Sequence, residues 1–343
     1  MNQQVHYDKQ IANWLLLCAV VILGMILLGA VTRLTHSGLS MVEWKPLVGI
    51  IPPLSEQAWL DVFEKYKQYP EYQQVNLGMS LEGFKYIFMY EYLHRVLGRL
   101  IGMLYFFPFV YFAIKGRIRA GLMPRLVLLF FLGGLQGLLG WYMVKSGLVN
   151  DPRVSQYRLT AHLGVAVAIY AYMFWLVFDL RAPPKAAALP YARYSLVLVG
   201  LVYLMILTGG LVAGTRAGFA YSTWPLMGNS FIPAGLYAGS PAWLSAFEDI
   251  TTIQFNHRMF AYLLVVLIGG FATMVWRSAQ LKGLRTGIAV LLLALLTQVG
   301  LGISTLLFHV PVPLAAGHQL GAMLLLTAML FVSHALWRGG GPD

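Results

Sequence analysis

Four histidines lie within long apolar stretches of this chain of 343 residues: His94, His162, His257 and His318. An ionisable side chain inside a membrane-spanning segment is costly, and it marks a functional site by default. Two imidazoles from neighbouring helices of one bundle can ligate a haem iron from opposite faces. The four histidines therefore predict two haem sites, with all four imidazoles as iron ligands.

Two other roles compete for these histidines. A zinc or copper site would need a third or fourth protein donor nearby, and none is evident in the second half of the sequence. An interhelical hydrogen bond is the simpler role. For the four histidines above it would require a coincidence of residue type, depth and position in four helices. It suits the remaining histidines, which lie at segment ends or in loops: His6, His36, His309 and His334.

Glu91 is an acidic residue inside an apolar stretch, three residues before His94 and therefore on the same helical face. The equivalent position in the second half is Gln254. A structural interpretation makes Glu91 the buried partner of Arg95 or Arg99. A functional interpretation makes it a proton-transferring carboxylate beside the first haem site. We favour the functional interpretation, because only one of the two sites has the carboxylate.

Five arginines lie near the histidines or at the outer ends of flanking segments. Guanidinium groups suit the carboxylates of haem propionates, although arginines in membrane proteins also extend towards the interface. Glycines beside the histidines would let a flat porphyrin approach the backbone, or would simply serve helix packing. The propionate candidates are Arg33, Arg95, Arg99, Arg216 and Arg258, and the glycines are Gly98, Gly164, Gly317 and Gly321.

The composition indicates which elements carry these residues. The chain is 59% hydrophobic and only 11% charged, whereas an ordinary soluble domain has about 25% charged residues. A membrane-spanning helix needs about 20 apolar residues, and the apolar runs do not alternate as barrel strands do. We therefore predict an all-α integral membrane protein with eight spans, near residues 11–32, 87–112, 124–144, 159–178, 194–214, 251–275, 286–308 and 314–336.

The net charge of +11 is explained by membrane topology. Twelve basic and three acidic residues fall on the face that carries both termini and the connections after the second, fourth and sixth spans. By the positive-inside rule this face is cytoplasmic, so the four histidines lie towards the outer leaflet. The opposite face is neutral, and the charge gives no reason to expect a nucleic-acid partner. The leader MNQQVHYDKQ lacks the features of a signal or transit peptide, so we expect an uncleaved first helix.

An internal repeat divides the chain into two halves, residues 1–180 and 181–343, each predicted to be a four-helix bundle. EYLHRVLGRL (91–100) parallels QFNHRMFAYL (254–263), and RLTAHLGVAV (158–167) parallels LAAGHQLGAM (314–323). GAVTRLTHSGLSMVEWKPLVG (29–49) parallels GLVAGTRAGFAYSTWPLMG (210–228), and Gln136 and Gly140 match Gln298 and Gly302. The chain contains one cysteine, Cys18, so it has no intramolecular disulfide.

The combination of EYLHR, LTAHLG, FNHR and AGHQLG resembles the haem A synthase family over about residues 12–337. The string SGLSMVEWKPLVG (37–49) is similar to the proteobacterial and mitochondrial branch. The resemblance implies an oxidoreductase that oxidises the C8 methyl of haem O to the formyl of haem A, for terminal cytochrome oxidases.

The resemblance also assigns the halves. It implies that His94 and His162 hold the haem O substrate beside an essential Glu91, and that His257 and His318 hold a permanent haem b that delivers electrons. It implies a multi-pass protein of the bacterial inner membrane, surrounded by lipid, with a haem O synthase and an electron donor such as a ferredoxin as partners. The source of the formyl oxygen, O2 or water, and a homo-oligomer are left open.

Two functions of other classes remain as alternatives. A two-haem b-type electron carrier linked to quinol would contain only haem b, and Glu91 counts against it. A haem transporter or chaperone would move haem without changing the mass of the porphyrin. The masses of the bound porphyrins distinguish all three functions.

Overall fold

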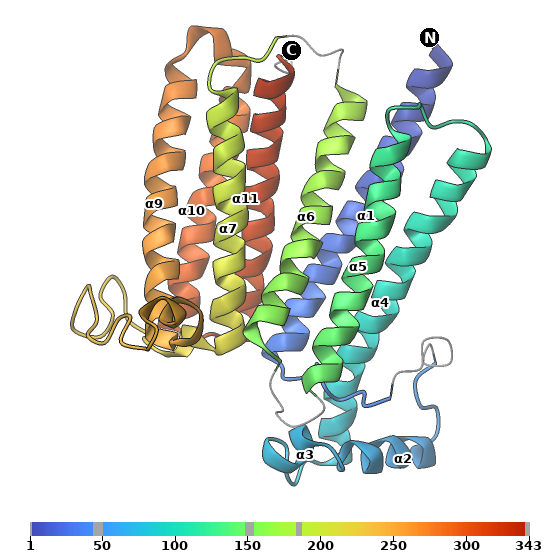
Figure 1. Ribbon diagram of the computed structural model, residues 1–343, viewed down its shortest axis with the longest axis vertical. Helices are drawn as coiled ribbons and strands as arrows, with labels where there is room; N and C mark the ends of the chain where they lie inside the picture. Colours follow the sequence, from blue (N-terminus) through green and yellow to red (C-terminus); the bar gives the residue numbers. More distant parts are fainter. Residues whose placement is uncertain (1, 44–50, 148–153, 183–186, 340–343) are drawn as a thin grey trace.

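The computed structural model describes residues 2–43, 51–147, 154–182 and 187–339 (Figure 1). Residues 44–49 of the first external motif, Lys185 and Asp343 lie outside the described residues. Within the described chain, eight helices are long and apolar enough to cross a membrane, which confirms the predicted number of spans. They are α1 (Asn2–Leu34), α4 (Leu81–Ile114), α5 (Met123–Gly147), α6 (Gln156–Arg181), α7 (Ala192–Thr215), α9 (Ile250–Arg277), α10 (Arg285–Leu307) and α11 (Val312–Arg338).

Helix α1 begins well before the predicted first span, because the polar leader is helical too. Gln4 Nε2 donates to Asp8 Oδ1 one turn later, at 3.0 Å. Asp8 also pairs with Arg119, from the connection after α4, at 3.4 Å. Side-chain pairs at this spacing stabilise a helix without an apolar face. A scan for apolar runs could not detect that extension.

The eight helices pack as two sets of four. In the first set α1 and α5 both contact α4 and α6, and in the second set α7 and α10 both contact α9 and α11. Figure 1 shows the second set on the left and the first on the right. The predicted boundary at residues 180 and 181 coincides with the end of α6. Alternate membrane helices therefore occupy opposite corners of each set.

The two sets meet along α6 and α7, with further contacts of α11 to α1 and α6. Glycines allow the close approach of α6 and α7: a Cβ placed on Gly214 would lie 2.6 Å from Gln156 Cβ. Tyr203 Oη on α7 donates to Gly164 O on α6 at 3.2 Å. Small residues at such interfaces let helix backbones approach in lipid. Gly164, predicted to lie beside a porphyrin, serves this helix packing.

The start of α1 and the end of α11 lie at one end of the molecule (Figure 1). Helices α2 (Glu56–Tyr66) and α3 (Pro70–Gln74) lie at the opposite end. The stretch after α7 lies at the α2–α3 end and contains η2 (Ala217–Phe219), η3 (Ala242–Leu244) and α8 (Ser245–Glu248), whereas η4 (Ala279–Leu284) joins α9 to α10.

Helix α2 packs its apolar side against the outer part of α4. Phe63 and Tyr66 are buried against Phe84, with ring centroids 4.9 and 5.0 Å from it. The aromatic face of α2 thus has a protein partner, because α4 extends beyond its apolar run.

At the opposite end, one carboxylate joins the two helix sets. Asp179 of α6 accepts from His334 Nε2 of α11 at 3.0 Å and pairs with Arg125 of α5 at 3.1 Å. Arg338 lies 3.5 Å from the same carboxylate. His334 thus makes the interhelical hydrogen bond that was predicted for it.

Candidate functional site

In the first helix set, each of the two histidines faces a glycine of an adjacent helix. A Cβ placed on Gly29 of α1 would lie 3.1 Å from His94 Nε2 of α4. A Cβ on Gly140 of α5 would lie 2.9 Å from His162 Cε1 of α6. Real Cβ atoms essentially never approach other atoms within 3.0 Å. The imidazole of His162 therefore occupies space that only a glycine leaves open.

The second helix set repeats this arrangement. A Cβ on Gly302 of α10 would lie 2.8 Å from His318 Cε1 of α11, and a Cβ on Gly209 of α7 would lie 3.5 Å from His257 Cε1 of α9. The matched pair Gly140 and Gly302 was visible in the sequence repeat. Gly29 and Gly209 were not identified as site residues, and the glycines that were predicted lie on the histidines' own helices.

The two histidines of each set come from opposite corners of a four-helix set. Helices α4 and α6 carry His94 and His162, and both pack on α1 and α5. Helices α9 and α11 carry His257 and His318, and both pack on α7 and α10. The sequence analysis expected neighbouring helices; this was wrong, because consecutive helices are the neighbours and the histidines lie on alternate ones.

The imidazoles have hydrogen-bond partners that the sequence analysis did not identify. His257 Nδ1 lies 2.8 Å from Thr208 Oγ1 of α7. His318 Nδ1 lies 3.2 Å from the backbone oxygen of Gln298. In the first set, His162 Nδ1 is buried near the backbone of Gln136 but outside hydrogen-bond geometry, and Gln136 Nε2 lies 3.4 Å from His162 Nε2.

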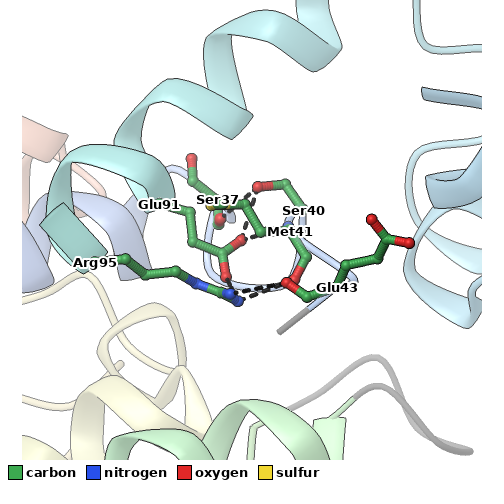
Figure 2. A network of polar contacts seen from close by, with 6 residues as sticks. All are labelled: Ser37, Ser40, Met41, Glu43, Glu91 and Arg95. Carbon is green, nitrogen blue, oxygen red and sulfur yellow. Dashed lines mark hydrogen bonds and ion pairs between the residues drawn. The ribbon is translucent and has the colours of Figure 1, made fainter. Parts of the chain in front are cut away.

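Glu91 is 2% exposed and belongs to a polar network at the outer part of α4 (Figure 2). Its Oε2 accepts hydrogen bonds from Ser40 Oγ and from Met41 N, both at 2.8 Å. Its Oε1 pairs with Arg95, one turn along the same helix. Arg95 also donates to Met41 O at 2.9 Å and to Glu43 O at 3.4 Å. The network therefore holds the segment that follows α1 against α4.

The equivalent residues of the second set hold the segment that follows α7. Gln254 Nε2 donates to Tyr221 O at 3.0 Å. Arg258 donates to Thr223 O at 3.1 Å and to Pro225 O at 2.6 Å. The hydrogen-bonding groups of the two segments explain why one position is Glu91 and the other Gln254. Ser40 and Met41 donate to the carboxylate of Glu91, whereas the second segment offers carbonyl oxygens that accept from the amide NH2 of Gln254.

Comparisons with known proteins identify the family of this chain. The profile of the cytochrome oxidase assembly protein family matches residues 12–330. The chain belongs to this family. It is 51% identical over 98% of its length to the heme A synthase of Nitrosospira multiformis, of which it covers 96%. It is 50% identical to the heme A synthases of Nitrosomonas eutropha, over 95% of this chain and 93% of that protein, and of Paramagnetospirillum magneticum, over 96% and 94%.

The residues of this family member fit a haem better than a zinc or copper ion. The described residues contain no group of three or more His, Cys, Asp or Glu side chains that could hold a metal ion. Each site supplies two imidazoles on opposite corners, which is the donor set for a porphyrin iron. Buried polar atoms without partners lie beside them, including Gln136 Oε1, Gln298 Oε1 and His162 Nδ1.

The structure gives the other propionate candidates of this family member protein partners. Arg33 Nη2 of α1 donates to Ala213 O and Gly214 O at the end of α7, at 3.0 and 3.3 Å. Arg216 Nη2 lies 3.1 Å from His36 Nδ1. Both arginines thus connect the two helix sets, where the negative ends of helix dipoles favour cations. Arg99 is half-buried on α4. A contact of any of these five arginines with a propionate stays a prediction.

Proposed function

We propose that this cytochrome oxidase assembly protein is a haem A synthase, an oxidoreductase that converts the C8 methyl of haem O to the formyl of haem A. The observation that carries the proposal is identity of 50–51% to proteins named heme A synthase over 95–98% of this chain. Two histidine pairs, each inside its own four-helix set, fit a reaction that uses one porphyrin as substrate and one as cofactor.

In this proposal residues 1–180 bind the substrate and residues 181–343 bind a permanent haem b. His94 and His162 ligate haem O, and His257 and His318 ligate haem b. The chemistry that a bis-histidine haem b supplies when bound is reversible one-electron transfer. Support for the assignment comes from the carboxylate, which lies beside the first histidine pair only. The glycines opposite the imidazoles have no side chain, and this leaves space for each ligand.

Glu91 is the proposed proton acceptor in the substrate half. It is buried, and it lies three residues before His94 on α4. Its hydrogen bonds to Ser40 and Met41 would hold the carboxylate in one orientation and close the outer end of the pocket. Replacement by glutamine keeps the shape and removes the proton-accepting group. The Glu91→Gln protein should therefore bind porphyrin but form haem A at least 100-fold more slowly.

The masses of the extracted porphyrins test the function. The full chain is expressed in a bacterial host that makes haem O but has no haem A synthase, and pigments are extracted from membranes and from the purified protein. We expect haem A with the wild type, and haem O with the His94→Ala and His162→Ala variants. Haem b alone, even with haem O supplied, would reject the synthase and favour the electron carrier. Transfer of haem between membranes with no change of mass would favour the transporter.

We further propose that the protein lies in the bacterial inner membrane, with both termini in the cytoplasm and the histidine pairs towards the outer leaflet. The basic residues at the end with both termini support this orientation. A haem O synthase as substrate donor and a ferredoxin-type electron donor are the proposed partners, because the substrate is made by another enzyme and its oxidation requires electron transfer.

A further inference from the structure

Each half of the chain has a pentapeptide beside one of its histidines, and the two pentapeptides differ at a single position. Residues 25–29 of α1 read MILLG, and residues 205–209 of α7 read MILTG. The final glycine of each faces an imidazole: Gly29 faces His94, and Gly209 faces His257. The two segments therefore hold equivalent places beside the two histidines. Leu28 is the counterpart of Thr208.

The hydrogen bonds of Thr208 determine which nitrogen of His257 carries the proton. Thr208 Oγ1 donates to Met205 O, one turn earlier in α7, at 2.8 Å. A carbonyl oxygen can only accept, so the hydroxyl hydrogen is used there. Towards His257 Nδ1, 2.8 Å away, the hydroxyl oxygen must therefore accept. Nδ1 carries the proton, and the lone pair of Nε2 is left for a metal.

The other histidine of this pocket is fixed in the same way. His318 Nδ1 lies 3.2 Å from the backbone oxygen of Gln298, which is also only an acceptor. Both imidazoles of the second set thus present Nε2 as the ligand atom. A hydrogen bond from the distal nitrogen of a ligating histidine fixes its orientation and raises its basicity.

The first helix set lacks the equivalent of the threonine. Leu28 has no hydrogen-bonding side chain, so it cannot make with His94 the hydrogen bond that Thr208 makes with His257. The preceding residues 25–27 are apolar too. A methionine methyl group lies near this pocket instead: a Cβ placed on Gly98 would lie 3.4 Å from Met25 Cε. The residue equivalent to Thr208 therefore does not fix the tautomer of His94.

We propose that Thr208 is a positioning residue that fixes His257 as a strong haem ligand, and that Leu28 leaves His94 a weaker ligand. This inference rests on the proposed function, because it explains how one half retains its haem while the other releases a product. A porphyrin bound through His257 and His318 stays with the protein. A porphyrin bound through His94 exchanges.

Haem retention tests the role of Thr208 without a measurement of catalysis. Thr208→Val removes the hydroxyl and keeps the shape of the side chain, and Thr208→Ser keeps the hydroxyl. Both are made in the full chain with His94→Ala, so that the His257 pocket holds the haem. The purified proteins are mixed with excess apomyoglobin, and the rate of haem b transfer is followed by absorbance. A redox titration gives the midpoint potential of the same samples.

We expect Thr208→Val to lose haem b roughly 10-fold to 100-fold faster than its parent, and to have a higher midpoint potential because the imidazole is a weaker donor. Thr208→Ser should match the parent in both. Equal transfer rates and potentials for the valine variant and its parent would overturn the role of Thr208. A change of the same size in the serine variant would also overturn it, because the hydroxyl would not be the cause.

The reverse substitution covers the case in which the valine variant does not fold. Leu28→Thr places a hydroxyl opposite His94, and in the His257→Ala background it should slow the transfer of porphyrin from the first pocket by about 10-fold or more. An unchanged rate would reject the inference. The proposed function fails separately: a wild type that retains haem b and makes no haem A is not a synthase, whatever the transfer rates are.

Discussion

Individual glycines set the positions of the proposed haem ligands. His318 Cε1 lies only 2.8 Å from the place that the Cβ of any larger residue at position 302 would take. A larger residue at position 302 would therefore clash with the imidazole, whatever its effect on the stability of the helix. The same helix offers a glycine with no such neighbour, Gly300, whose Cβ would meet nothing within 4 Å.

Gly302→Ala should displace the His318 imidazole and remove the low-spin haem b spectrum of the purified protein. Gly300→Ala should leave that spectrum unchanged. Both substitutions gain roughly 0.5–1 kcal/mol of helix propensity, so stability alone cannot separate them. The absorbance spectra of the two reduced proteins make the comparison. Normal haem content in Gly302→Ala would show that His318 can move without loss of ligation.

A second residue with an unusual environment is Glu71, in the short helix α3. It is 5% exposed and accepts a hydrogen bond from Tyr66 Oη at 3.1 Å. Burial, with a smaller contribution from the charge of Glu91, raises the pKa of the Glu71 carboxyl from 4.5 to about 8. At neutral pH the folded segment therefore holds a proton that the unfolded segment has released.

The stability of this external segment should fall as the pH rises from about 4.5 to about 8, by up to about 1.4 kcal/mol per pH unit. Glu71→Gln keeps an acceptor for Tyr66 and cannot ionise, so it should remove this dependence. Hydrogen-exchange protection factors of the Val75 and Asn76 amides, which bond to Glu71 O at 3.0 Å, measure the effect. Parallel pH profiles for variant and wild type would contradict it.

At the residue scale the sequence was informative where a costly residue type occurs inside an apolar run. Such residues include the four histidines and Glu91. The sequence did not indicate Thr208, because a hydroxyl group in a helix costs little free energy. It usually donates a hydrogen bond to a backbone carbonyl of its own helix, as Thr208 does to Met205. Arg95 was predicted as a partner of Glu91, and the structure contains that ion pair. The other two partners, Ser40 and Met41, were not predicted because they lie about 50 positions away in the chain. Only the fold shows that these atoms meet.

At the scale of elements, each helix set carries, at the end opposite the chain termini, a segment held by two residues of a histidine-bearing helix. Arg258 is 8% exposed, and its guanidinium group accounts for hydrogen bonds to Thr223 O and Pro225 O. Loss of that group would leave carbonyl oxygens of the segment without a donor. Hydrogen bonds to charged groups contribute about 1.5–3 kcal/mol each.

Arg258→Met should therefore loosen residues 221–230 while α9 stays folded. The backbone amide of Met227, which donates to Ser230 O at 2.8 Å, is the reporter. We expect its hydrogen exchange to accelerate roughly 10-fold to 100-fold, which corresponds to about 1.4–2.8 kcal/mol. Arg277→Met, at the other end of the same helix, should not change it. Acceleration in both variants would indicate a general loss of stability instead.

The sequence predicted the spans well because lipid forces a continuous apolar run on every membrane helix. It gave no information on the polar N-terminal part of α1 or on the packing partner of α2, because the requirement for a continuous apolar run does not apply to these segments. Their positions depend on particular partners, such as Asp8 with Arg119 and Phe63 with Phe84. The expected neighbouring placement of the paired histidines was wrong for a similar reason, because a repeat shows which helices are alike and not which are adjacent.

At the scale of the whole molecule, the two helix sets are joined by contacts at both ends. Arg33 binds the end of α7 on the side of the external segments, and Asp179 joins α5, α6 and α11 on the other. Asp179→Asn would weaken the bond to the buried His334 and leave Arg125 and Arg338 without this anion. We expect a loss of about 1–3 kcal/mol, measured as a lower midpoint of thermal unfolding in detergent. Glu82→Gln, on an exposed turn, is the matched control.

The proposed membrane orientation rests on how the charges are distributed over the two ends. The end with both termini carries most of the excess positive charge, and the opposite end carries α2, α3 and the segment after α7 (Figure 1). Positive residues are retained in the cytoplasm during insertion. The single native cysteine, Cys18, is buried and so gives little background labelling. New cysteines at exposed positions can therefore report which side each end occupies.

Ala120→Cys lies between α4 and α5 at the end with the termini, and Ala238→Cys lies between α7 and α9 at the other. In intact spheroplasts a membrane-impermeant maleimide should label Ala238→Cys and not Ala120→Cys, and after lysis it should label both. The opposite pattern would place the histidine pairs towards the cytoplasm. A haem O synthase would then have to deliver its product to the other leaflet, and a soluble electron donor would meet the sites directly.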